Sequence, residues 1–305
     1  MVGATITYAV IAVGIFAIFA WLNWQAFVDY ITWTMTVSER AAQADPENPD
    51  AVMAAMMPPA SVMGIIPAYT LMSLLFYLLF AAYEAACLRW MIRGEAPGLF
   101  GLSLGADTWR VYFSYWIWLF LGIAIYIVIL AVTFGMVGIG VAMSSGSENG
   151  ALVVGLIAPF LVLGLLLVWL YVAVRFAPAA ATSVARKRFA FFEAWKVTKG
   201  RFWGMFGAFA LVFLMYFVFV IVCGVAASVI MGVSVMAVLG AGGEPQNPEE
   251  VFALLATPQV MVPVALIYAV IIVAAFMFYM AMFGINARAA ALAVEEGKIQ
   301  GPAQA

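Results

Sequence analysis

Six long apolar runs are the feature that most restricts the fold of this chain. Each exceeds the roughly 20 residues that a helix needs to cross the hydrocarbon core of a bilayer. None shows the strict alternation of a membrane-barrel strand, and a closed barrel is the only other way to span lipid. The sequence therefore predicts an all-α membrane protein, a single domain over residues 1–305. We expect six transmembrane helices at about 5–36, 61–90, 111–143, 151–176, 202–238 and 259–287.

Composition agrees with lipid as the solvent for most of the chain. Of its 305 residues, 67% are hydrophobic and only 9% are charged, whereas soluble domains are about one quarter charged. A water-soluble domain of this length could not bury so much apolar surface. The first, third and fifth runs are longer than a bilayer requires, so we expect those helices to tilt, break or protrude.

Charge is divided unevenly between the segments that join the six runs. Residues 38–60, 144–150 and 239–258 hold mainly acidic side chains, whereas twelve of the thirteen Lys and Arg residues lie in the other segments. Basic segments stay on the cytoplasmic side of a membrane. We therefore expect a multi-pass protein of the bacterial inner (plasma) membrane with both termini in the cytoplasm.

A short pattern occurs in two of the basic segments. Trp109 in DTWRV follows Arg89 by twenty residues, and Trp195 in EAWKV follows Arg175 by twenty. This match predicts three repeated helical hairpins with interfacial amphipathic segments on the cytoplasmic side, the alternative being a chance coincidence. The predicted interfacial residues are Asp107, Trp109, Arg110, Arg186, Lys187, Arg188, Glu193, Trp195, Lys196 and Lys199.

The second copy of the pattern has helical spacing. Phe191 or Phe192, Trp195, Thr198 and Phe202 fall on one face, Lys196 and Lys199 point elsewhere, and Gly200 is a natural stop. The spacing predicts an amphipathic helix lying in the inner interface. It is interpreted either as a topological anchor attracted to anionic lipid, or as a headgroup-recognition or partner-docking surface.

The second, fourth and sixth helices each carry an arginine at the predicted inner end. With two nearby polar residues these arginines form a predicted inner-rim polar cluster, made of Glu84, Arg89, Arg175, Asn286 and Arg288. Glu84 and Arg89 are five residues apart and point about 140° away from each other on a helix. We therefore expect Glu84 to pair with Arg175 or Arg288, or with an interfacial tryptophan or a backbone donor.

The usual materials for catalysis are scarce. The chain has no histidine, and its two cysteines, Cys87 and Cys223, lie inside apolar runs. Adjacent carboxylates occur only at two places that are predicted to be solvated ends. We therefore expect no enzymatic activity, no cofactor and no metal, and without a basic tail we expect no nucleic acid partner.

Two stretches resemble a known family. RFAPAAATSVARKRFAFFEAWKVTKGRFW (175–203) and LSLGADTWRVY (102–112) are similar to segments of bacterial integral membrane proteins. These are the membrane domain of some glycerophosphodiester phosphodiesterases and its stand-alone, alphaproteobacterial-type six-helix relatives. The resemblance implies a six-helix bundle of repeated hairpins and no catalytic residues. The phosphodiesterase activity belongs to a separate soluble domain that uses histidines, so it is not expected here.

Three functions are compatible with these features. The first is a non-enzymatic membrane protein whose basic cytoplasmic rim interacts with anionic membrane lipids or another amphiphile. The second is an accessory subunit of a membrane complex, with membrane-protein partners or a homo-oligomer. The alternative is a translocator of a hydrophobic or amphiphilic substrate, which would require a polar cavity reaching the middle of the membrane.

The start of the chain departs from the predicted repeat. The first apolar run begins within about five residues of Met1, with no Lys or Arg before it. We expect the natural protein to begin upstream with an amphipathic, basic segment. The competing interpretation is that the first hairpin has lost its interfacial segment.

Overall fold

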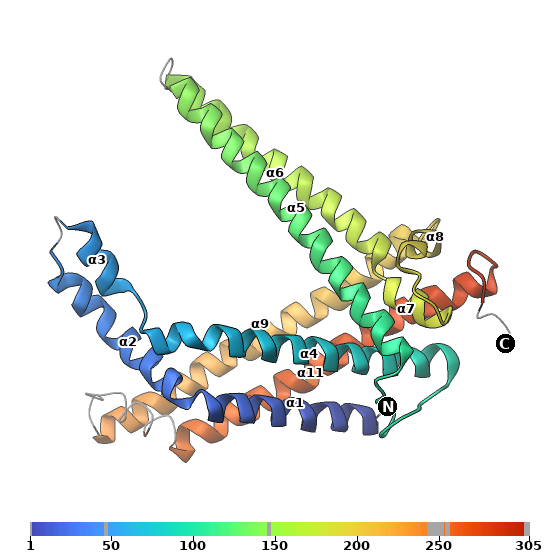
Figure 1. Ribbon diagram of the computed structural model, residues 1–305, viewed down its shortest axis with the longest axis horizontal. Helices are drawn as coiled ribbons and strands as arrows, with labels where there is room; N and C mark the ends of the chain where they lie inside the picture. Colours follow the sequence, from blue (N-terminus) through green and yellow to red (C-terminus); the bar gives the residue numbers. More distant parts are fainter. Residues whose placement is uncertain (1, 46–47, 145–147, 243–252, 254–256, 302–305) are drawn as a thin grey trace. The chain divides into compact units, whose positions relative to one another are not determined.

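The computed structural model describes residues 2–301 except 46–47, 145–147, 243–252 and 254–256, and the regular elements of this part of the chain are helices (Figure 1). Six of the described helices are long and apolar enough to cross a membrane. These are α1 (Val2–Leu22), α4 (Ala60–Arg93), α5 (Ala106–Ser144), α6 (Glu148–Phe176), α9 (Phe202–Gly242) and α11 (Pro258–Glu295). The chain is therefore a multi-pass membrane protein, as its six apolar runs predict.

The first predicted helix, at about 5–36, is wrong as a single element because it breaks at Asn23. There the backbone leaves the helical region, with φ −112° and ψ 18°. The Asn23 side-chain amide donates to the Phe19 carbonyl at 2.8 Å, a local bond through which Asn competes with helix continuation. α1 ends before Asn23, and α2 (Trp24–Gln43) follows it with a more polar sequence.

Two helix ends in this part of the chain are set by glycine. α4 stops before Gly94, whose φ is +69°. α11 continues two turns past its predicted end at 287, through an Ala-rich segment of high helix propensity. It stops where Gly297 (φ +67°) donates to the Val294 carbonyl and Lys298 donates to the Ala293 carbonyl. These two bonds are those of a Schellman motif.

The contacts of the described chain divide it into two compact units. Unit 1 is Met1–Thr5, Phe80–Leu211 and Met280–Ala305, and unit 2 is Ile6–Leu79 and Val212–Tyr279. Charge follows the same division. Unit 1 carries twelve of the thirteen bases and seven acids, whereas unit 2 carries one base and eight acids.

Within unit 2, the short helix α3 (Pro49–Met56) packs beside α2 (Figure 1). Asn48 caps α3 by accepting bonds from the amides of residues 50 and 51. Asp29 on α2 accepts from the Ser61 hydroxyl at 2.5 Å and from Gln25 at 3.0 Å. These bonds fix the polar loop that joins the first two spans.

Within unit 1, α5 and α6 lie side by side as a long antiparallel pair (Figure 1). α7 (Ala179–Ala185) packs against α5, and all seven of its residues are buried. Its hydroxyl side chains bond inward, Thr182 to the Pro178 carbonyl at 2.8 Å and Ser183 to the Ala179 carbonyl at 2.9 Å. Small side chains and internally bonded hydroxyls let this segment pack closely, although the sequence presents it as part of a basic loop.

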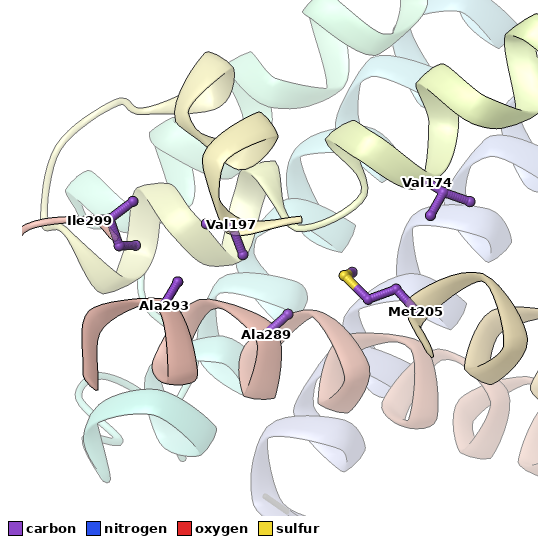
Figure 2. Close-up of a cluster of buried hydrophobic side chains, with 6 residues drawn as sticks. All are labelled: Val174, Val197, Met205, Ala289, Ala293 and Ile299. Atoms are coloured by element: carbon purple, nitrogen blue, oxygen red, sulfur yellow. The ribbon is translucent and has the colours of Figure 1, made fainter. Parts of the chain in front are cut away.

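A buried cluster in unit 1 joins segments that are far apart in sequence (Figure 2). It is made of Val174, Val197, Met205, Ala289, Ala293 and Ile299. These residues belong to α6, α8 (Ala194–Val197), α9, α11 and the segment after α11. Because Val174 points into this cluster, the neighbouring Arg175 lies about 100° further around α6, and its side chain is only partly buried.

Candidate functional site

Every sequence-predicted site residue belongs to unit 1. We define the basic rim as residues 84–112, 171–206 and 284–300 of this unit, which contain all twelve of its bases. The rim also holds six carboxylates. The carboxylates neutralise some of these bases, and only the bases left unpaired can bind an external anion.

Asp107 joins two helix ends. Its carboxylate accepts bonds from Arg93 of α4 at 2.5 Å and from Arg110 of α5. Arg93 also bonds Glu95 at 3.0 Å and the Val184 carbonyl at 2.7 Å. Asp107 therefore joins the end of α4 to the start of α5, and Arg93 joins α4 to α7.

Glu193 has the same role in the second basic segment. It lies in a short 3-10 helix, Phe191–Glu193, and accepts bonds from Arg186 and from Arg188, the latter at 2.7 Å. Arg186 is buried and also donates to the Gln300 side chain at 3.2 Å. The basic run at 186–188, which reads as a free patch in the sequence, is therefore largely paired.

Glu296 also pairs with two bases, Arg201 and Lys298. The hydrogen bond from Lys298, together with the positive charge of Arg201, lowers the pKa of Glu296 below its ordinary value. Arg201 precedes α9 and Glu296 follows α11, so this ion pair joins two segments 95 residues apart.

Glu84 is buried on α4 and accepts a hydrogen bond from the Tyr115 hydroxyl of α5. The prediction that it pairs with Arg175, Arg288, a tryptophan or a backbone donor is therefore wrong. A neutral hydroxyl suffices because it satisfies the carboxylate without bringing a second buried charge.

The five residues of the predicted inner-rim cluster do not form one cluster. In the described structure no hydrogen bond or ion pair joins any two of them. Arg89 is buried and donates to the Gly101 carbonyl at 3.3 Å, in a loop where φ is positive. Arg288 is 68% exposed and lies 3.8 Å from Glu295, and the side-chain oxygen of Asn286 is buried with no partner in the described structure.

Arg175 lies instead among aromatic rings. Its guanidinium carbon is 5.1 Å from the ring centre of Tyr171, 5.0 Å from that of Trp195 and 5.7 Å from that of Phe202. Its Nε and Nη2 donate to the Tyr171 hydroxyl at 3.0 and 2.9 Å, and Nη1 approaches the Thr198 hydroxyl at 3.4 Å. No carboxylate of the described chain forms an ion pair with it.

The rings around Arg175 border a groove of about 410 Å³ between α6 and α9. We call it the Arg175 groove. It is lined by Leu167, Leu170, Tyr171, Arg175, Phe202, Trp203 and Phe206. Tyr171 is a partner that the sequence could have indicated, because it precedes Arg175 by four residues on one helix.

The two copies of the tryptophan pattern share an environment but not a local structure. Val111 and Val197 are fully buried, while Trp109 and Trp195 are 44% and 40% exposed. The first copy is the opening of α5, which begins at Ala106 and not at 111 as predicted. The second runs from Glu193, the end of the 3-10 helix, through the single turn α8, so the amphipathic helix predicted from the spacing of residues 191–202 does not form as one element.

Gly200 is predicted to end this helix, but α8 already ends at Val197 with Thr198 as its C-cap. Gly200, with φ +79°, instead lies in the turn before α9, which starts at Phe202. The side chains of Lys196 and Lys199 are exposed and have no ion pair in the described part of the chain. Lys187 is 3.7 Å from Glu95, a loose pair between exposed side chains.

Comparisons with protein-family models, curated proteins and solved structures found no match for this chain. The resemblance to the membrane domain of glycerophosphodiester phosphodiesterases therefore stays a prediction. In the described residues no group of three or more Cys, Asp or Glu side chains is placed to hold a metal ion. What the rim can do must be argued from its own charges and surfaces.

Proposed function

We propose that this chain is a non-enzymatic multi-pass protein of the bacterial inner membrane that binds anionic lipid at its basic rim. In this proposal the rim and both termini face the cytoplasm. The support for this orientation is that unit 1 holds twelve of the thirteen bases, and basic segments are retained on the cytoplasmic side.

The observation that carries the proposal is a surplus of cations after internal pairing. Five of the six rim carboxylates already have basic partners, and Glu84 is bonded to Tyr115. Four bases remain without a carboxylate in the described structure: Arg89, Arg175, Lys196 and Lys199. Of these, Arg89 is buried, so three are available to an external anion.

Exposed aromatic residues beside these cations favour a lipid over a soluble anion. Trp195 and Trp203 are both exposed within the rim. Tryptophan prefers the headgroup level of a membrane, where its ring is apolar and its N–H remains hydrated. We infer that the repeated hairpins, if they share an origin, use their tryptophans as interfacial anchors, which the matched burial of the two Trp–Val pairs supports.

A titration of the full-length protein in mild detergent tests the proposal. Native mass spectrometry would count bound phosphatidylglycerol and phosphatidylcholine at low and high salt. We expect phosphatidylglycerol to bind more tightly and to weaken with salt, because screening reduces exposed charge interactions. The proposal is contradicted if the two lipids bind equally well at both salt concentrations.

A double variant with Lys196→Gln and Lys199→Gln gives the matching loss-of-charge test. Each base near an anionic surface contributes about 1 kcal/mol, so we expect phosphatidylglycerol affinity to fall by about ten-fold or more. Arg40→Gln is the control, since Arg40 is an exposed base of unit 2. It should leave the affinity unchanged.

A further inference from the structure

Arg175 is fixed in position but not neutralised, and unlike Arg89, which also lacks a carboxylate in the described structure, it is not fully buried. Five rim arginines bond carboxylates at close range, namely Arg93, Arg110, Arg186, Arg188 and Arg201. Arg175 is held by three rings and two hydroxyls, all uncharged. A guanidinium held in one orientation loses little conformational freedom when it binds a second group.

The donors of Arg175 are not exhausted by its present partners. A guanidinium has five N–H groups, and its three bonds here go to the hydroxyls of Tyr171 and Thr198. The remaining donors can bond the oxygens of a phosphate, the planar anion recognition for which arginine is suited. No acidic residue lines the Arg175 groove, so nothing in it repels an anion.

The rest of the groove is apolar and extends along the membrane-spanning part of α6. Leu167 lies eight residues before Arg175, which is about 12 Å along the helix axis. Leu170 of α6 and Phe206 of α9 also line the groove, and both leucines are exposed. A cation at the rim with an apolar wall leading toward the membrane interior matches the polarity of an anionic phospholipid.

The aromatic rings also discriminate between headgroups. Rings that surround a cation site can bind a quaternary ammonium such as choline. Here one face of each of Tyr171, Trp195 and Phe202 is turned to the guanidinium of Arg175. This cation repels a quaternary ammonium placed near the same rings, so we expect the groove to favour a headgroup with net negative charge over a zwitterionic choline headgroup.

We propose that the Arg175 groove is a specific phospholipid site, in which Arg175 binds the phosphate of an anionic lipid and one acyl chain lies along Leu167, Leu170 and Phe206. This inference rests on the proposed function, because it names one discrete site within the basic rim. It adds that the first lipid to bind depends on the geometry of one arginine as well as on the charge of the rim.

Native mass spectrometry of the full-length protein with phosphatidylglycerol tests the assignment through a matched pair of variants. Arg175→Lys keeps the charge but loses the planar fork, and we expect the first binding event to weaken by roughly ten-fold. Arg288→Gln removes a whole charge from an exposed rim position, and we expect a change of less than about two-fold. Equal effects of the two variants would overturn the site.

Leu170→Trp provides a second variant that leaves the aromatic packing of Arg175 untouched. Leu170 is exposed, so a larger side chain there can be accommodated while it fills the groove. We expect it to weaken long-chain phosphatidylglycerol and to spare a short-chain analogue. An unchanged affinity for the long-chain lipid would contradict the acyl-chain placement.

Competition with inorganic phosphate tests whether the Arg175 groove binds the phosphate of a lipid or free phosphate. We expect millimolar phosphate not to displace the long-chain lipid, because phosphate lacks the apolar contacts. Displacement would mean that the groove is a phosphate site and would overturn the lipid assignment. If the wild-type protein binds no anionic lipid at all, the proposed function fails together with the site. If binding persists but ignores Arg175, only the site fails.

Discussion

Removing the carboxylate of Asp107 should destabilise the protein more than removing that of Glu193 or Glu296, each of which also pairs with two bases. The side chain of Asp107 is 10% exposed, that of Glu193 is 23% exposed and that of Glu296 is 43% exposed. An ion pair loses strength as water reaches it, and an exposed pair contributes little. The three carboxylates therefore form a graded series within one chain.

The expected loss of unfolding free energy depends on how many bonds the bases keep after each carboxylate is removed. Breaking a buried pair costs about 3–5 kcal/mol when the remaining charge has no partner. Arg93 keeps its bonds to Glu95 and to the Val184 carbonyl after Asp107→Ala. We therefore expect a loss of about 2–3 kcal/mol for Asp107→Ala and about 1–2 kcal/mol for Glu193→Ala, with Glu296→Ala the smallest of the three.

Thermal unfolding in detergent, followed by tryptophan fluorescence, measures the series. Each kcal/mol lowers Tm by about 2 °C in a chain of this size, so Asp107→Ala should lower Tm by about 4–6 °C. Asp50→Ala, at an exposed position of unit 2, is the control. If Asp107→Ala lowers Tm no more than Glu296→Ala does, the assigned role of Asp107 in joining the helix ends is wrong.

Three further predictions concern the buried carboxylate, the pH dependence and the orientation. Glu84→Gln and Tyr115→Phe should each lower Tm. The double variant should lose about 1 kcal/mol less stability than the sum of the two single losses, because the two side chains share one hydrogen bond. Strict additivity in the same unfolding assay would count against that bond. The pKa of Glu296 is lowered, so its contribution to stability is present above pH 4.5, its ordinary pKa, and is lost as pH falls below that value. The Tm of wild type and that of Glu296→Gln should therefore converge at acidic pH. A Tm difference that grows on acidification would refute the direction of this pKa shift. The orientation can be tested with single cysteines in a background without Cys87 and Cys223. A cysteine in place of Asp50 should react with a membrane-impermeant reagent in intact cells, and a cysteine in place of Lys187 should not. Labelling at position 187 would mean that the proposed orientation is wrong.

The six spans could be predicted from sequence because hydropathy and length act locally. A run of apolar residues needs no knowledge of its neighbours to be assigned to lipid. The break at Asn23 was harder to see, because it depends on one side chain bonding a carbonyl four residues back. The sequence becomes more polar after that residue, but the change is gradual and does not by itself mark a break at Asn23.

The partners within the site could be predicted only in part. Tyr171 stands four residues before Arg175, so their contact is readable along one helix. Trp195 and Phe202 also contact this arginine, through the path of the chain between α6 and α9, which local helical spacing does not predict. The partner of Glu84 depends on how α4 and α5 are rotated against each other, which hydrophobic pattern does not fix when both helices are apolar nearly all round.

The buried helix α7 shows a different reason for failure. Its alanine, threonine, serine and valine side chains are equally compatible with a loop and with a tightly packed helix. The adjacent basic run at 186–188 favours the loop interpretation, yet Arg186 is buried against Glu193. The number of basic residues in a run therefore does not give the number of unpaired charges. The cations that could bind an external anion are those that form no ion pair with a carboxylate of the described chain.

The lipid composition that accompanies the protein out of its own membrane is the most direct test of an anionic-lipid-binding rim. The full-length chain would be purified in mild detergent, and the lipids bound to it quantified by mass spectrometry against a total extract of the same membranes. We predict enrichment of anionic phospholipid over the extract, with the enrichment lost in the Lys196→Gln, Lys199→Gln and Arg175→Gln triple variant. A bound fraction with the same composition as the whole membrane, unchanged by that variant, would contradict the account.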